Sequence, residues 1–157
     1  MTQRVELNLA EYFPYLINRV GVALVFAFET QALRRYGLSV SMWRVLAALS
    51  SNGGQRLVDL SAMTSIDVST LSRMVTRLVR LGLATRTRSP KSEREIMVEL
   101  SVKGRRIVTR LIPIARRFER RLLAGVPRTD LPTVKRALRQ MHKNLTVPPA
   151  HAPRRRH

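Results

Sequence analysis

The first part of the chain shows apolar residues at helical spacing, separated by short polar breaks. A long helix is predicted from about Leu9 to Tyr36, and Gly37 follows it as a residue that readily ends a helix in the left-handed conformation. A second helix is expected after Ser39 or Ser41, either of which can cap it, and it should stop at the Asn-Gly-Gly sequence of residues 52–54. The apolar stripe of the long helix consists of Phe13, Leu16, Ile17, Val20, Leu24, Phe26 and Phe28.

The middle of the chain changes from a helical period to an alternating one. Two short helices are predicted, from about Leu57 to Met63 and from Asp67 to Leu81, and only a short junction separates them. From Ala84 to Leu100, two strand-like stretches flank residues 89–93, which have turn composition. The second stretch alternates cleanly, so one face should carry Ile96, Val98 and Leu100. The pattern therefore indicates a helix-turn-helix followed by a β-hairpin.

The C-terminal part of the chain returns to helical spacing. Ser101 can cap a helix from about Val102 to Ala124, in which Pro113 should produce a kink or a split. A last helix is predicted from Asp130 or Leu131 to Leu145, with apolar positions at the spacing of a short coiled-coil seam. Those positions are Leu131, Val134, Leu138, Met141 and Leu145. Residues 147–157 have no periodicity and are expected to form a disordered basic tail.

The charge balance points to a polyanionic partner. The 157 residues include 29 Lys and Arg against 10 Asp and Glu, which gives a net charge of +19. Nucleic acid is the first candidate and an anionic membrane surface the second. The membrane alternative is weakened because no helix offers a Trp- or Phe-rich apolar face that is free to insert.

The fourth predicted helix has the composition of a helix that reads the major groove. Its apolar face carries Val68, Leu71, Val75 and Leu78, and its other face has arginines and short hydroxyl side chains without a carboxylate. Hydroxyl groups suit phosphates and base edges, and guanidinium groups suit guanine or phosphate. The predicted DNA contacts on this helix are Ser69, Thr70, Ser72, Arg73, Thr76 and Arg77. The alternative is an ordinary surface helix with a basic face.

The hairpin adds a second group of cations. Arg86 and Arg88 lie on its first strand, Lys91 lies at its tip and Arg94 follows the tip. A basic β-tongue beside a major-groove helix can place an arginine in the adjacent minor groove. The alternative is a solvated hairpin whose charges discourage edge pairing, but that alternative does not explain why the charges share one sign.

These segments together resemble the regulators of the MarR (multiple-antibiotic-resistance regulator) family. The phrase VSTLSRMVTRLVRLGL, from Val68 to Leu83, is similar to the family's recognition helix with its closing Leu-Gly-Leu. The phrase from Leu100 to Gly104 resembles its Leu-Thr-x-x-Gly element, and SMWRVLAAL, from Ser41 to Leu49, resembles the preceding helix. The resemblance extends from about residue 10 to 145.

The predicted wing departs from the family pattern at one position. Where the family has an Asp-x-Arg phrase, a gapless alignment places Ser92 at the acidic position and Arg94 at the arginine. Glu93 lies one residue away from the acidic position, so whether it replaces the usual acid is left open.

The resemblance implies a mainly α-helical fold with a small β-hairpin. A single domain over residues 1–146 would place a winged helix-turn-helix lobe over 39–101 between dimerisation helices over 9–36 and 102–146. The residues support dimerisation independently, because the apolar faces of the first and last helices have no other obvious partner. The implied partners are a pseudo-palindromic DNA operator and a second copy of the chain.

The resemblance also implies a small-molecule effector, because family members commonly bind aromatic acids, phenols or their CoA thioesters beside the DNA-binding lobe. Arg19 and Arg44 are suitable partners for a carboxylate or phosphate. For most of the candidate ligand contacts named next, the alternative is ordinary core packing. The candidate ligand contacts are Tyr15, Asn18, Arg19, Val22, Phe26, Met42, Trp43, Arg44 and Phe118. The expected function is a ligand-released repressor, and the alternative is an architectural DNA-binding protein without an effector.

Other functions are not expected. The chain has no cysteine, so disulfides and thiol-based redox sensing are excluded. Its three histidines, His142, His151 and His157, have no spacing with acidic residues that suggests a metal site or a general base, so neither an enzyme nor a cofactor is expected. The apolar stretch from Tyr15 to Phe28 is too short to span a bilayer and the N-terminus lacks a signal-peptide pattern, which predicts a cytoplasmic protein.

Overall fold

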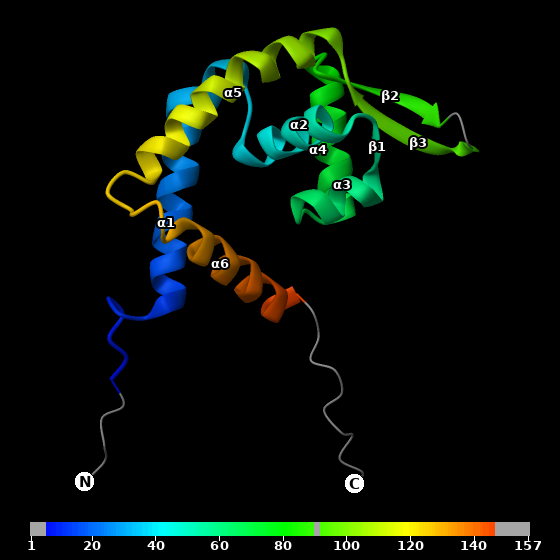
Figure 1. Cartoon of the computed structure of the whole chain (residues 1–157). Coiled ribbons are helices and arrows are strands. Elements are labelled where there is room, and N and C mark those ends of the chain that lie inside the picture. The colour runs from blue at the N-terminus through cyan, green and yellow to red at the C-terminus, as the bar shows by residue number, and fades with distance from the viewer. Residues whose placement is uncertain (1–5, 90–91, 147–157) are drawn as a thin grey trace, which may run out of the picture. The chain divides into compact units, whose positions relative to one another are not determined.

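The computed structural model describes the backbone of residues 6–89 and 92–146, together with their side chains except those of 89 and 92–95. The chain forms two compact units that divide between Phe118 and Glu119, and each is described by itself. The first unit contains five α-helices and a small antiparallel sheet among the described residues (Figure 1). The predicted mainly α-helical fold with a β-hairpin is confirmed.

The first predicted helix is continuous but changes its pitch twice. Helix α1 (Phe13–Phe28) is followed by a π-helical segment, η1 (Glu29–Leu33), and by a 3₁₀ turn, η2 (Arg34–Tyr36). The helix begins at Phe13 rather than Leu9, because Pro14 provides a favourable first turn and residues 9–11 form a separate turn. Gly37 ends the run with φ at 67°, as predicted.

Helix α2 (Val40–Asn52) is fixed at its N-terminus by two side chains. The Ser39 Oγ accepts a hydrogen bond from the backbone N of Met42 at 3.2 Å, which confirms Ser39 rather than Ser41 as the cap. The Glu29 Oε1 accepts a second bond from the backbone N of Val40 at 2.8 Å. The helix ends at Gly53, which has φ at 73°. The start of α2 is therefore stabilised by a side chain that lies eleven positions earlier in the chain.

Helices α3 (Leu57–Thr64) and α4 (Val68–Arg80) form the predicted helix-turn-helix. Ser65 takes the left-handed conformation between them, with φ at 55°. Asp67 caps α4 by accepting a hydrogen bond from the backbone N of Thr70. Figure 1 shows α2, α3 and α4 packed together in one lobe.

The sheet has one strand more than the sequence predicted. Strands β2 (Ala84–Ser89) and β3 (Ser92–Leu100) form the expected hairpin, and β1 (Gln55–Arg56) pairs with the other edge of β3. The strand order is β1-β3-β2, and both pairs are antiparallel. A two-residue strand has no periodicity of its own, so only its partner in β3 reveals it.

The face of β3 that carries Ile96, Val98 and Leu100 is buried over only part of its length. Val98 and Leu100 are buried, but the side chain of Ile96 is 51% exposed. Ile96 lies opposite Arg88, close to the hairpin turn, where the hairpin extends away from the helices (Figure 1). Alternation in sequence therefore marks the face but not how far along the strand the core reaches.

Helix α5 (Val102–Leu122) begins at a close junction with the end of α4. The Ser101 Oγ accepts a bond from the backbone N of Gly104 at 2.9 Å and donates one to the carbonyl of Gly82 at 2.6 Å. Gly104 is buried, and a Cβ at this position would clash with the backbone carbonyl oxygen of Leu83. A glycine is therefore required where α5 crosses the turn after α4.

Pro113 does not split α5. The helix is continuous through it, and the proline is exposed, so its ring faces solvent rather than the core. The loss of one backbone hydrogen bond is tolerated there because Leu111 and Val108 anchor the other side of the helix in the core.

The second unit contains the end of α5 and helix α6 (Leu131–Thr146). Helix α6 starts at Leu131, one of the two predicted positions, and ends one residue beyond the predicted Leu145; none of its residues is buried. Its apolar residues Val134, Leu138 and Leu145 are 45%, 48% and 89% exposed. The expected tail, residues 147–157, lies outside the described residues.

The helical run from Phe13 to Tyr36 is long and apolar enough to cross a membrane by length and composition alone. This is longer than the Tyr15–Phe28 stretch on which the sequence argument rested. Helices of soluble proteins also reach this length and hydropathy, and this run contains the charged residues Arg19 and Glu29.

Candidate nucleic-acid interface and adjacent pocket

The N-terminus of α4 is held by a network around Asp67. The Asp67 Oδ1 accepts hydrogen bonds from the backbone N of Thr70 at 2.8 Å and from the Ser69 Oγ at 2.7 Å. These bonds, led by the one from the Thr70 backbone, hold the pKa of Asp67 well below its usual range. The Ser69 hydroxyl hydrogen is therefore occupied in the free protein, while its oxygen lone pairs remain able to accept.

Helix α4 has an apolar face and a polar face on opposite sides, as the sequence predicted. Leu71, Val75 and Leu78 are fully buried, but Val68, which was placed on the same face, is 44% exposed at the first turn. Val68 lies at the edge of the lobe because the core contacts of α4 begin one turn later. The helix presents its arginines and Ser69 to solvent, while the other hydroxyl residues of this face are half-buried, namely Thr70, Ser72 and Thr76.

Two predicted arginines are exposed and weakly held. The Arg73 Nη2 donates to the Thr70 Oγ1 at 3.4 Å, and the Arg77 Nη2 donates to the backbone carbonyl of Gly37 at 3.5 Å. Both bonds are long and solvent-exposed. Each guanidinium group can therefore exchange its present partner for a phosphate or a base edge at small cost.

Arg86 has a different environment from the other arginines. Its Nη2 donates to the carbonyl of Ser72 at 3.2 Å and to the Thr76 Oγ1 at 2.9 Å, and the Thr76 Oγ1 in turn donates to the Ser72 carbonyl at 3.0 Å. These bonds join β2 to the polar face of α4. In this arrangement Arg86 positions the hairpin against the helix, and Thr76 is its partner.

The structure describes the other cationic residues of the hairpin only in part. Arg88 is exposed on β2. Arg94 lies on β3 by its backbone, and its side chain is outside the described residues. Lys91 lies outside the described residues altogether.

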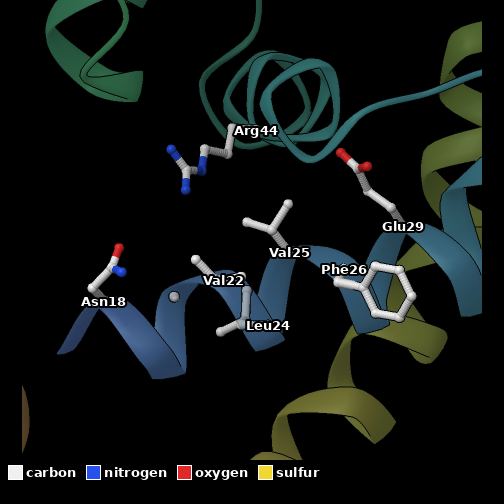
Figure 2. Close-up of a pocket in the computed structure, with 8 residues that line it drawn as sticks. Asn18, Val22, Leu24, Val25, Phe26, Glu29 and Arg44 are labelled. Atoms are coloured by element: carbon white, nitrogen blue, oxygen red, sulfur yellow. The ribbon is translucent and has the colours of Figure 1, made fainter. Parts of the chain in front are cut away.

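An open pocket of about 580 Å³ lies between α1 and α2. Figure 2 shows α1 side chains along one wall and Arg44 of α2 facing them. Arg44 is exposed and makes no hydrogen bond or ion pair with any residue in the described part of the chain. The pocket is lined by Asn18, Gly21, Val22, Leu24, Val25, Phe26, Glu29 and Arg44. The site thus combines an apolar wall with an available guanidinium group.

Four of the nine predicted ligand contacts line this pocket: Asn18, Val22, Phe26 and Arg44. The other five are Tyr15, Arg19, Met42, Trp43 and Phe118. Tyr15 and Arg19 contact each other, with the guanidinium carbon 5.7 Å from the ring centre. Met42 is only 2% exposed and belongs to the core.

Trp43 and Phe118 pack against Phe28, with ring centres 6.2 Å and 5.0 Å from its ring. The sequence argument missed Gly21, Leu24, Val25 and Glu29 of the pocket. Glu29 carried a signal, because it is an acid that directly follows a long apolar stretch.

No group of three or more His, Cys, Asp or Glu side chains that could hold a metal ion occurs among the described residues.

Comparison with known proteins identifies the family of this chain. The family model described as "MarR family" matches residues 36–95, which run from the end of η2 into β3. A solved MarR-family transcriptional regulator from Silicibacter pomeroyi is 30% identical, and the alignment covers 88% of this chain and 92% of that chain with a TM-score of 0.76. The chain belongs to the MarR family.

Further relatives agree with this membership. The HTH-type transcriptional repressor IacR from Pseudomonas putida is 27% identical over 136 residues, 86% of this chain and 81% of that protein. Bordetella bronchiseptica BpsR, whose structure concerns regulation of DNA binding by 6-hydroxynicotinic acid, is 26% identical with a TM-score of 0.76 over 84% of this chain and 99% of that chain. MarR-family regulators bind operator DNA and form dimers, and the protein is a transcriptional regulator of this winged helix-turn-helix type.

Proposed function

We propose that this MarR-family protein is a homodimeric repressor that a small molecule releases from a pseudo-palindromic operator. The observation that carries the proposal is the pocket between α1 and α2, where Arg44, which has no partner among the described residues, faces an apolar wall. The pocket lies at the N-terminal helix of the DNA-binding lobe, so an occupant would contact that lobe directly.

The DNA-contacting part of the proposal combines α4 with the hairpin. Arg73 and Arg77 would read base edges or phosphates in the major groove, assisted by the hydroxyls and the free backbone N–H groups of the first turn. Arg94 and Lys91 would reach the adjacent minor groove, and Arg88 the backbone beside it. Arg86 would act by holding the hairpin at α4.

The dimer part of the proposal uses the outer helices, residues 9–36 and 102–146. Phe13, Val20 and Phe26 of α1 are 52%, 55% and 65% exposed, and the α6 seam is exposed as well. Exposed apolar side chains of this size are costly in water and support a protein interface on these helices. A second copy of the chain is the partner that a two-fold operator requires.

The effector proposed is an aromatic acid, a phenol or an aromatic acyl-CoA thioester. The pocket volume of about 580 Å³ is within the usual range for small-molecule sites. Arg44 would pair with the anionic group, the Asn18 amide would hydrogen-bond to it, and Val22 and Val25 would contact the ring. The relation of BpsR to 6-hydroxynicotinic acid supports this class of ligand.

Arg44→Gln tests the effector site. Thermal-shift screening with aromatic acids and their CoA thioesters, followed by operator release, should identify a ligand whose affinity falls about tenfold or more in this variant, because a charged hydrogen bond is lost. Arg110→Gln, an exposed substitution on α5, is the matched control. Equal affinity in wild type and Arg44→Gln would remove the pocket from the proposal.

The alternative function, an architectural DNA-binding protein, is favoured by the net charge of +19. Such a protein would bind random and selected duplexes equally, with a steep salt dependence and no response to a ligand.

The localisation that we propose is the cytoplasm, because a regulator of this kind acts on chromosomal DNA.

A further inference from the structure

Glu29 belongs to the pocket and to the DNA-binding lobe at the same time. Its side chain lines the pocket (Figure 2). Its Oε1 accepts the hydrogen bond from the backbone N of Val40 at 2.8 Å. Val40 is the first residue of α2, and the first N–H groups of a helix have no partner within the helix. A carboxylate at this position also interacts favourably with the helix dipole. Glu29 thus helps to fix where the lobe begins.

The backbone around Glu29 departs from α-helical geometry. Glu29 starts the π-helical segment η1, and the 3₁₀ turn η2 follows before Gly37. Both helix types have weaker hydrogen-bond geometry than an α-helix, and π-helical turns often occur at functional sites. The connection from α1 to α2 is therefore not a regular continuation of α1.

The same connection also touches the DNA-reading helix. The Gly37 carbonyl accepts the 3.5 Å bond from Arg77 of α4, and Gly37 lies three residues before Val40. A pocket residue thus holds one end of this short segment and a DNA-reading residue contacts the other. A shift at Val40 would move the carbonyl against which Arg77 rests.

We propose that Glu29 recognises a hydrogen-bond donor on the effector and transmits occupancy of the pocket to the DNA-binding lobe through Val40. This inference rests on the proposed function. Arg44 lies one turn after Val40, on the same side of α2 and about 6 Å along its axis. A ligand whose carboxylate pairs with Arg44 therefore extends its far end towards Glu29.

The effector class that fits is an aromatic acid with a hydroxyl or ring N–H at the end remote from its carboxylate. That donor bonds to the Glu29 carboxylate and draws it towards the ligand. The bond to the Val40 backbone N then lengthens, and the start of α2 is released.

The link between Glu29 and α2 is tested without a ligand. Amide hydrogen exchange at Val40 is measured by NMR in the wild type, in Glu29→Gln and in Glu29→Ala, with Glu11→Gln as a matched control for loss of one exposed carboxylate. Exchange should rise about tenfold in Glu29→Ala, since the acceptor is gone, and stay near wild type in Glu29→Gln, whose amide oxygen can accept the same bond. Unchanged exchange in Glu29→Ala would overturn the link.

Recognition of the donor is tested with 4-hydroxybenzoate and 4-methylbenzoate, which have similar length and differ in the donor. By calorimetry the wild type should prefer 4-hydroxybenzoate about tenfold, and Glu29→Ala should bind both equally while keeping its affinity for 4-methylbenzoate. Only 4-hydroxybenzoate should accelerate exchange at Val40 in the wild type.

The two proposals fail in different ways. An equal preference in wild type and Glu29→Ala would overturn Glu29 as the recognition residue and leave the proposed effector class intact. Failure of the wild type to bind either acid would count against the effector class and against donor recognition together, while the ligand-free exchange measurement would still decide whether Glu29 holds α2.

Discussion

The DNA-binding lobe and the outer helices are built from similar amphipathic sequences but bury very different amounts of them. In the lobe, Leu46, Leu60, Leu71 and Leu78 are fully buried within one chain. In α6, none of the apolar residues is buried, and Leu138 is 48% exposed. The core of the lobe is therefore complete within one chain, whereas α6 leaves its apolar residues exposed, as the proposed dimer seam expects. Substitutions in the two regions should accordingly affect different properties.

The largest effect is expected within the lobe, from Gly104→Ala. The added Cβ would clash with the Leu83 carbonyl, which is backbone and cannot rotate away. The free energy of unfolding in urea should fall by about 3 kcal/mol or more, at the upper end of overpacking effects. Gly21→Ala is the matched control, because nothing lies within 4 Å of its Cβ position, and it should be neutral or slightly stabilising. Equal stability of the two variants would contradict the close junction between α5 and the turn after α4.

The next effect concerns the outer helices. Leu138→Glu places a charge in the proposed α6 seam, and the dissociation constant of the dimer should rise about 100-fold or more, since the charge would have to be buried without a partner. Gln140→Glu, on an exposed position of the same helix, introduces the same charge and should leave the dimer intact. Sedimentation velocity would measure both, and a Leu138→Glu variant that remains dimeric would remove the seam from the interface.

A smaller effect is expected on the polar face of the lobe. Arg73→Ala or Arg77→Ala should each cost about 1–3 kcal/mol of operator binding and relax sequence preference at the contacted bases. Stability should not change, because both side chains are exposed and weakly bonded. Arg110→Ala on α5 is the control for a simple loss of charge. Unaltered operator affinity in both α4 variants, measured by fluorescence anisotropy, would move the DNA-reading face elsewhere.

The smallest effect is a pH dependence at the N-terminus of α4. The pKa of Asp67 is lowered in the folded protein, so its bonds contribute stability above the pKa of the unfolded chain, near 3.8, and this contribution is lost as the pH falls below it. Asp67→Ala should therefore lower the melting temperature at pH 7 and have little effect near the folded-state pKa. A difference between wild type and variant that does not shrink on acidification would contradict this assignment.

Elements within one chain segment were predictable from sequence, because their causes are local. The Gly37 and Gly53 ends and the polar face of α4 follow from residue type and spacing. Ser39 was one of two predicted caps, and Asp67 was predicted as the start of its helix rather than as its cap. The motif from Leu100 to Gly104 was found by resemblance, and the structure supplies its cause in the contact of Gly104 with Leu83.

Features that depend on distant segments were not predictable. Strand β1 exists because Gln55 and Arg56 pair with Val98 and Met97 of β3. Arg86 was predicted as a DNA contact, but the hairpin brings it to Ser72 and Thr76.

The residues that line the pocket were also only partly predictable, because they depend on distant segments. The family resemblance suggested Met42, Trp43 and Phe118 as ligand contacts, with core packing as the alternative. In the structure the two aromatic rings pack against Phe28 and Met42 lies in the core. Glu29 could not be identified as a pocket residue from spacing alone, because its partner lies beyond two changes of helix type.

The central claim is that the lobe of this MarR-family regulator reads a specific DNA sequence. The most direct measurement is the affinity of the wild-type protein for an operator selected from random duplexes and for a scrambled duplex of equal length, by anisotropy at physiological salt. The account predicts a preference of about 10³-fold or more for the selected operator. Equal affinity for the two duplexes would contradict it and favour an architectural DNA-binding protein.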